Sequence, residues 1–127
     1  MAKRQIIAGD GIIKHPQPFP IAVRIKDTIY SATISGEDPK TMKLPGNPEA
    51  EVTQAFANMR KIVEAGGASV GDIAKVVVYL ADRKDRDLVN KEWIKMFPDE
   101  SDRPVRHAIT SNLPAGMMIQ LEFVAVV

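Results

Sequence analysis

The sequence predicts an α+β fold in which a single mixed sheet carries two helices on one face. The first observation is the order of elements along the 127 residues, which is three strands, a helix, a strand, a helix and two strands. The second is that each helix falls between strands, which is typical of two β-α-β-like halves laid on one side of a sheet. The other face has no helices of its own, so we expect it to pack against copies of the same chain.

Three strand-like runs precede the first helix, at residues 3–8, 21–25 and 28–34. The first run is short and is predicted to be an edge strand, and the other two are joined by Lys26-Asp27 as a tight hairpin turn. Three prolines among residues 15–20 exclude a helix in that segment. It is therefore predicted to be an extended arm that holds the ring of Phe19 stiffly.

The first helix is specified at both of its ends. Asn47 can cap its first turn, and Pro48 suits the first helical position because its missing N–H would have no helical partner there. The negative carboxylates of Glu49 and Glu51 are expected to interact favourably with the positive end of the helix dipole. The Gly-Gly pair at residues 66–67 predicts where the helix stops. An apolar stripe recurs at spacings of three and four, at Val52, Ala55, Phe56, Met59, Ile62 and Val63.

Residues 73–80 are predicted to form a central strand, because the run is rich in β-branched side chains and short for a helix. A second helix is expected to begin at Asp82 or Asp85 and to run to about Met96. The Phe97-Pro98 step stops it, since a residue before proline resists helical geometry. Its predicted buried side consists of Leu88, Val89, Trp93, Ile94 and Met96.

Residues 103–127 are predicted to form a hairpin. Two apolar runs alternate like strands and flank the turn signal Leu113-Pro114-Ala115-Gly116. The first strand is expected at residues 106–111, and the second is expected to begin near Ile119 and to end at Val127.

The predicted hairpin carries three side chains that can act on a ligand. The guanidinium of Arg106, the amide of Gln120 and the carboxylate of Glu122 would lie close together on it. The forked donors of an arginine match two oxygens at once, which suits Arg106 to a carboxylate or a phosphate. A structural ion pair of Arg106 with Glu122, or with a neighbouring subunit, is the alternative interpretation. His107 should point away from Arg106, toward a subunit contact or the core.

Composition argues against several classes of protein. The chain is 45% hydrophobic, which fits one domain over residues 1–127. A net charge of +1, from 17 basic and 16 acidic side chains, argues against a dedicated nucleic-acid or membrane surface. The absence of cysteine excludes thiolate chemistry, and the presence of only two histidines argues against a histidine-rich metal site. No apolar stretch has the length of a signal peptide or a membrane span, so we expect a cytoplasmic protein.

Several stretches match one family, in order, along nearly the whole chain. They are Thr28-Ile29-Tyr30, residues 36–39, residues 62–82, Val89-Asn90 with Trp93, Arg103-Pro104-Val105-Arg106, Leu113-Pro114 and the closing strand to Val127. On these residues the sequence resembles members of the RidA/YjgF superfamily, also called endoribonuclease L-PSP. Each stretch alone is a weak signal, whereas their common order is specific.

The resemblance implies a chorismate-mutase-like α+β fold that assembles as a homotrimer, with three pockets at the clefts between subunits. It also implies hydrolysis of reactive enamines and imines, such as 2-aminoacrylate, to 2-keto acids and ammonia, without a metal or an organic cofactor. Two other functions stay open. One is a trimer that binds and senses a small carboxylate without turnover, and the other is an endoribonuclease, against which the near-neutral charge counts.

The resemblance also implies the residues of a substrate site. Arg106 stands at the arginine that grips the substrate carboxylate in the family, and Asn90 matches in a VNxxW version of a VNxxY pattern. Phe19 stands where the family has a pocket tyrosine, so the ring is kept and the hydroxyl is lost. Ala32 and Thr33 replace a Ser-Gly pair, which removes one hydroxyl and adds another one residue later.

Catalysis in the family depends on a carboxylate of the last strand. Counted from Leu113-Pro114, that position falls on Gln120, and Glu122 matches a second acidic residue on the same face. A glutamine can orient water but cannot hold or release a proton, and loss of a proton-transfer group typically costs roughly a hundred- to ten-thousand-fold in rate. The loop before the strand is one residue shorter than usual. Glu122 is therefore the alternative catalytic residue, since a shift by two residues keeps the face of a strand.

Overall fold

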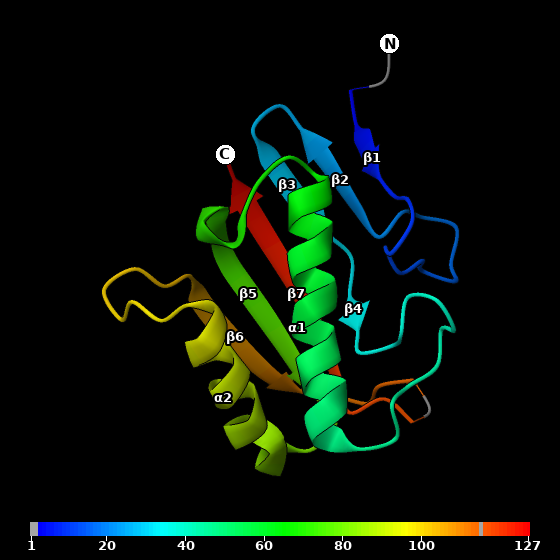
Figure 1. The fold of residues 1–127 in the computed structure, drawn as a ribbon, viewed down its shortest axis with the longest axis vertical. Coiled ribbons are helices and arrows are strands. Elements are labelled where there is room, and N and C mark those ends of the chain that lie inside the picture. Colours follow the sequence, from blue (N-terminus) through cyan, green and yellow to red (C-terminus); the bar gives the residue numbers. More distant parts are fainter. Residues whose placement is uncertain (1–2, 115) are drawn as a thin grey trace.

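The computed structural model describes residues 3–114 and 116–127, so Ala115 of the predicted turn lies outside the described residues. A layer of two α-helices lies over one face of a sheet (Figure 1). In chain order the elements are β1 (Gln5–Ile7), β2 (Ala22–Ile25), β3 (Thr28–Ser31), β4 (Ile34–Ser35), α1 (Pro48–Ala65), the 3-10 helix η1 (Val70–Asp72), β5 (Ile73–Leu80), the 3-10 helix η2 (Arg83–Asp85), α2 (Arg86–Met96), β6 (Val105–Thr110) and β7 (Ile119–Val126).

The sheet has seven strands in the order β1-β2-β3-β7-β5-β6, with the short β4 also paired to β7. β5 and β6 run parallel, whereas the other pairs are antiparallel. The predicted α+β class, with a single mixed sheet and two helices on one face, is confirmed. The predicted edge strand is β1, and the predicted central strand is β5, which has neighbours on both sides.

α1 begins and ends where the sequence predicts. The side chain of Asn47 accepts a hydrogen bond from the backbone N–H of Ala50 at 2.9 Å, and Pro48 is the first helical residue. Gly67 adopts a left-handed φ of 88°, which stops the helix. All six residues of the predicted apolar stripe are buried against the sheet, and they form the centre of the core.

The predicted hairpin of residues 103–127 is wrong. β6 and β7 are not paired with each other, because β5 lies between them. In the register of the sheet, Val76 of β5 is the partner of Arg106 on one side and of Phe123 on the other. Consecutive strands usually lie side by side, but here an earlier strand occupies the place between them.

The strand predicted at residues 28–34 is interrupted in the middle. β3 pairs with β7 up to Tyr30, and β4 resumes the pairing at Ile34. Between them the Oγ of Ser31 accepts a hydrogen bond from the backbone N–H of Phe123 at 2.9 Å, so a side chain replaces a backbone partner. The interruption frees the next residues from the ladder, and Thr33 is one of them.

Both predicted starts of the second helix are used. The side chain of Asp82 accepts a hydrogen bond from the N–H of Lys84 at 2.9 Å and caps η2, while Asp85 stands at the N-cap of α2. Val89 and Trp93 are buried as predicted. Ile94 is 55% exposed, so its predicted burial is wrong. It is one residue beyond Trp93 and therefore points about 100° away from it around the helix.

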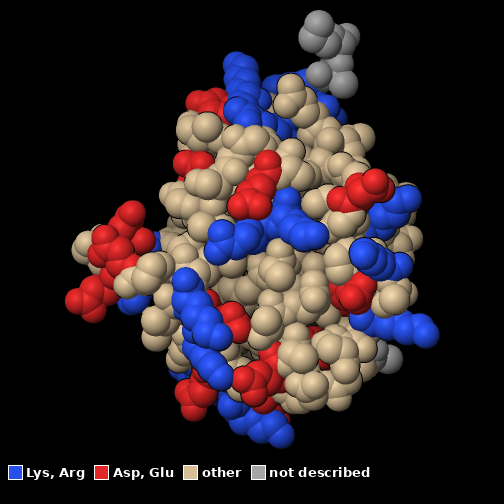
Figure 2. Space-filling view, in the orientation of Figure 1, with Lys and Arg blue, Asp and Glu red and all other residues tan. Residues whose placement is uncertain are grey.

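The surface carries both signs of charge, and the helix-free face carries apolar side chains. On the helix-covered face, basic and acidic side chains are interspersed (Figure 2). On the opposite face Tyr30, Val105 and Val126 are each about half exposed or more, at 48%, 65% and 47%. Within residues 3–114 and 116–127, none of the helices has the length and apolar character needed to span a membrane.

Candidate functional site

Arg106 projects from β6 toward α2, where two side chains hold its guanidinium. Its Nη2 donates a hydrogen bond to Oδ1 of Asn90 at 2.7 Å. Its Cζ lies 4.9 Å from the ring centroid of Trp93, within the range of a cation–π contact. Asn90 and Trp93 are three residues apart on α2 and so share one helix face. The structure thus brings together two predicted site residues, Arg106 and Asn90, and adds Trp93 to them.

The hydrogen-bonding capacity of the Arg106 guanidinium is not filled. Its Nη1 is buried and has no hydrogen-bond partner in the described part of the chain. Burial, followed by the positive charge of Arg86, lowers the pKa of Arg106 from its usual value. A buried donor without a partner costs about 1–3 kcal/mol, and a ligand oxygen at Nη1 would remove that cost. Arg106 is therefore positioned to bind an anion.

Gln120 lines a different cavity, which has a volume of about 760 Å³. Thr33 lines it as well, because the interruption between β3 and β4 leaves this residue beside the Ser35–Gln120 pair. The proline-rich arm supplies part of the wall through His15 and Gln17. The Nε2 of Gln120 lies 3.5 Å from the sulfur of Met117, which is a weak acceptor. The structure therefore brings together Gln120 and Thr33.

The carboxylate of Glu122 is hydrogen-bonded to Tyr79 of β5. The hydroxyl of Tyr79 donates a hydrogen bond to Oε1 of Glu122 at 2.8 Å. This hydrogen bond, with some burial, raises the pKa of Tyr79 above its ordinary value, so the hydroxyl keeps its proton. Tyr79 is also the strand partner of Gln120. Within one chain, Gln120 faces the cavity and Glu122 pairs with Tyr79 next to it.

Phe19 and Ala32 line cavities other than that of Gln120. The ring of Phe19 contacts that of His15, with centroids 4.2 Å apart, and is one wall of a separate cavity of about 190 Å³. Ala32 packs against the core, and its backbone N–H donates to the carbonyl of Ile21 at 2.7 Å. In a single chain, neither residue lines the cavity of Gln120.

Arg106 and Gln120 point to opposite faces of the sheet. Leu121 and Phe123 of β7 are buried under the helices, so Gln120 and Glu122, which alternate with them, face the helix-free side. Arg106 faces α2 on the helix-covered side. The prediction that one hairpin brings Arg106, Gln120 and Glu122 close together is therefore wrong. An ion pair between Arg106 and Glu122 within the chain is excluded for the same reason.

Sequence reasoning missed two residues next to the candidate groups. Tyr79 could have been found, because it alternates with the buried Val78 and Leu80 and so must share the helix-free face of β5. Glu51 gave no such signal. Its carboxylate is buried and binds the backbone at the start of β7, although its position in the first turn of α1 predicts an exposed role.

The candidate groups lie in a chain that matches known proteins over most of its length. A family model described as endoribonuclease L-PSP matches residues 13–127. The 2-iminobutanoate/2-iminopropanoate deaminase of Escherichia coli strain K12 is 31% identical over 111 residues, which cover 86% of this chain and 87% of that protein. A RutC family protein of Pyrococcus abyssi is 30% identical over 127 residues, which cover 98% of each chain.

A solved structure shows that the fold is shared as well. The crystal structure of RidA from the Antarctic bacterium Psychrobacter sp. PAMC 21119 has a TM-score of 0.91 and 30% sequence identity, and the match covers 98% of this chain and 100% of that one. The region matched by the family model contains every element from β2 to β7, and with them Arg106, Asn90 and Gln120. The chain therefore belongs to the endoribonuclease L-PSP family, that is, to the RidA/YjgF superfamily.

Proposed function

We propose that the chain hydrolyses 2-imino acids, the tautomers of enamines such as 2-aminoacrylate, to 2-keto acids and ammonia. The observation that carries the proposal is the buried Nη1 of Arg106, which has no hydrogen-bond partner among residues 3–114 and 116–127, while Asn90 and Trp93 hold the rest of the guanidinium in place. A ligand carboxylate offers acceptor oxygens in the geometry that a guanidinium binds best. The similarity to a 2-iminobutanoate/2-iminopropanoate deaminase, at 31% identity, supports this substrate class.

The proposed site is shared between copies of the chain in a homotrimer. One chain holds two incomplete halves, one with Arg106 and Asn90 and the other with Gln120 and Thr33. A trimer with a pocket at each subunit cleft would join the Arg106 half of one copy to the Gln120 half of the next. The apolar side chains exposed on the helix-free face, Tyr30 among them, support such an assembly.

In the proposed reaction, water adds to the imine carbon, the carbon–nitrogen bond breaks and ammonia leaves. Arg106 fixes the substrate carboxylate, and the amide of Gln120 from the next copy orients the water. An amide transfers no proton, so the protons that the water loses reach the departing nitrogen through solvent. Thr33, which lines the cavity beside Gln120, shapes the pocket around the substrate side chain. Phe19 and Ala32 line other cavities of the single chain, so they would contribute to the pocket only through the assembly of copies.

Binding of a 2-keto acid tests the carboxylate anchor. In Arg106→Ala, the affinity for 2-oxobutanoate measured by titration calorimetry should fall at least about tenfold, because a charge-assisted hydrogen bond contributes about 1.5–3 kcal/mol. Arg60→Ala is the matched control, since Arg60 is an exposed arginine of α1 that lies 4.0 Å from Glu64. Unchanged binding in Arg106→Ala would contradict the proposal.

Turnover tests the catalytic part against a ligand-sensing trimer. The amide of Gln120 favours the sensor, because that side chain cannot move a proton. The decisive assay follows the decay of freshly generated 2-aminoacrylate with the wild-type protein and with Gln120→Glu. We expect catalysed decay by the wild type and faster decay by Gln120→Glu. A wild-type protein that binds 2-keto acids but leaves the decay rate unchanged would be a sensor.

A further inference from the structure

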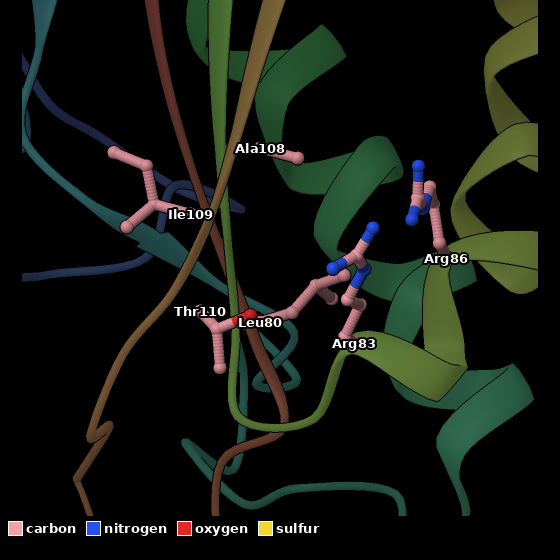
Figure 3. A pocket seen from close by; sticks show the side chains of 6 residues that line it. All are labelled: Leu80, Arg83, Arg86, Ala108, Ile109 and Thr110. Carbon is pink, nitrogen blue, oxygen red and sulfur yellow. The ribbon is translucent and has the colours of Figure 1, made fainter.

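A groove between β6 and the start of α2 contains two arginines that the proposed reaction does not use. It encloses a cavity of about 300 Å³ lined by Leu80, Arg83, Arg86, Ala108, Ile109 and Thr110. In Figure 3, Arg83 and Arg86 extend from the α2 side with Ala108 of β6 pointing toward them, whereas Ile109 points away on the other side of the strand. Both arginines are exposed, so a ligand can reach them from solvent.

The face of β6 that lines this groove also carries Arg106. On β6, Arg106, Ala108 and Thr110 occupy alternate positions and share one face of the strand. On the opposite wall Arg86 lies one helical turn before Asn90, which binds Arg106. Four residues of α-helix rise about 6 Å, so Arg86 and Asn90 are about that far apart along the axis of α2. Ala108, which lines the groove, follows Arg106 on this face of β6 and has a small side chain.

The described part of the chain does not balance the positive charges along the groove with ion pairs. Across residues 3–114 and 116–127, no carboxylate forms an ion pair within 4.0 Å of Arg83, Arg86 or Arg106. The guanidinium of Arg86 is close enough to lower the pKa of Arg106, after the larger effect of burial. Like charges repel, and an anion between them would offset that repulsion.

We propose that the groove binds a second anionic group, so that the preferred ligands are dicarboxylic 2-imino and 2-keto acids. The C1 carboxylate binds at Arg106, and the terminal carboxylate reaches Arg83 and Arg86. This inference rests on the proposed function, because it uses Arg106 as the anchor of the C1 carboxylate. It adds the substrate class, since a monocarboxylic acid would leave Arg83 and Arg86 without a ligand oxygen.

Two keto acids of equal chain length test the inference. 2-Oxoglutarate and 2-oxopentanoate differ only in the terminal carboxylate, and their affinities are measured by titration calorimetry with the wild type and with Arg83→Ala/Arg86→Ala. We expect the wild type to prefer 2-oxoglutarate at least about tenfold and the double variant to lose that preference, because each charge-assisted hydrogen bond is worth about a tenfold change or more. The affinity for 2-oxopentanoate should stay unchanged.

Controls separate a specific site from general charge and from the anchor. Lys84→Ala removes a cation of the same 3-10 helix that does not line the groove, and it should keep the preference. Arg86→Lys, combined with the intact Arg83, should retain part of it. Arg106→Ala should weaken the binding of both keto acids. Unchanged binding in that variant would contradict the proposed function, whereas the selectivity of the wild type tests the groove separately. A wild type that binds both acids equally, or neither, would overturn the inference.

Discussion

The carboxylate of Glu51, in the first turn of α1, accepts a hydrogen bond at 2.8 Å from the backbone N–H of Met118, which follows it by 67 residues. Glu51 is only 4% exposed. Met118 immediately precedes β7, and Gln120 is the second residue of that strand. A carboxylate of the helix layer therefore fixes the start of the strand that carries the proposed water-orienting residue.

Glu51→Gln should change how stability depends on pH. Burial raises the pKa of Glu51 above its ordinary value of 4.5, although the backbone N–H groups of Met118 and Ile119 oppose the rise. The folded wild type then binds more protons than the unfolded chain just above pH 4.5, so its stability falls as pH rises through that window. Thermal unfolding between pH 4 and pH 7 should show the melting temperature of wild type falling relative to Glu51→Gln. A constant difference would contradict the prediction.

Gly36→Ala should destabilise the fold. A Cβ at Gly36 would clash with the backbone oxygen of Glu51, so the helix or the strand end has to shift. Such overpacking typically costs about 1–3 kcal/mol. Gly71→Ala is the control, because the nearest atom there is the Oγ of Ser69 at 3.6 Å, an ordinary contact. Urea unfolding of both variants measures the difference, and equal midpoints would show that the close approach at Gly36 is relieved without cost.

Asn90→Ala should weaken the binding of 2-keto acids without abolishing it. The variant removes the acceptor for Nη2 of Arg106 but leaves the charge and the contact with Trp93. We expect an affinity loss of about tenfold or less, smaller than that of Arg106→Ala, because the guanidinium becomes less well positioned. Calorimetric titration with 2-oxobutanoate measures it. Lys91→Ala is the control on the same helix, since Lys91 pairs with Glu49 at 2.8 Å, and a similar loss there would indicate a general effect on α2.

Two variants with defects in different halves of the proposed pocket should together restore ligand binding. Arg106→Ala blocks one half of the proposed pocket, and Gln120→Trp fills the other with a large ring. The two variants, unfolded together and refolded as a mixture, should regain 2-oxobutanoate binding, because in the proposed trimer some clefts join an intact Arg106 half to an intact Gln120 half. Each variant refolded alone is the control. If the mixture binds no more than the two variants separately, the pocket does not span two subunits.

Local chemistry made much of the fold predictable. Asn47 and Pro48 define the start of α1 through a cap and a fixed φ, and these causes act within a few residues. The same holds for β5, whose β-branched run coincides with the observed strand from Ile73 to Leu80. In the site, the pairing of Arg106 with Asn90 agrees with the motif on which the resemblance rests.

The parts that were not predictable depend on contacts between distant residues. Nothing within residues 103–127 shows that β5 will lie between β6 and β7, because that order follows from the packing of the whole sheet. The burial of Glu51 has the same origin, since its partner Met118 lies on a distant segment. The cationic groove was not predicted, because Arg83 and Arg86 belong to a run of mixed charges, which is typical of a solvated helix start.

The opposite orientations of Arg106 and Gln120 also determine how many pockets an assembly of copies would complete. Since Arg106 and Gln120 lie on opposite faces of the sheet, each contact between copies joins unlike surfaces, and such head-to-tail contacts leave unmatched ends unless a ring closes. Two copies complete a single pocket and leave one Arg106 half and one Gln120 half without a partner. A closed ring completes as many pockets as it has members. The catalytic rate per chain, measured as the protein is diluted, would therefore report whether the ring is closed.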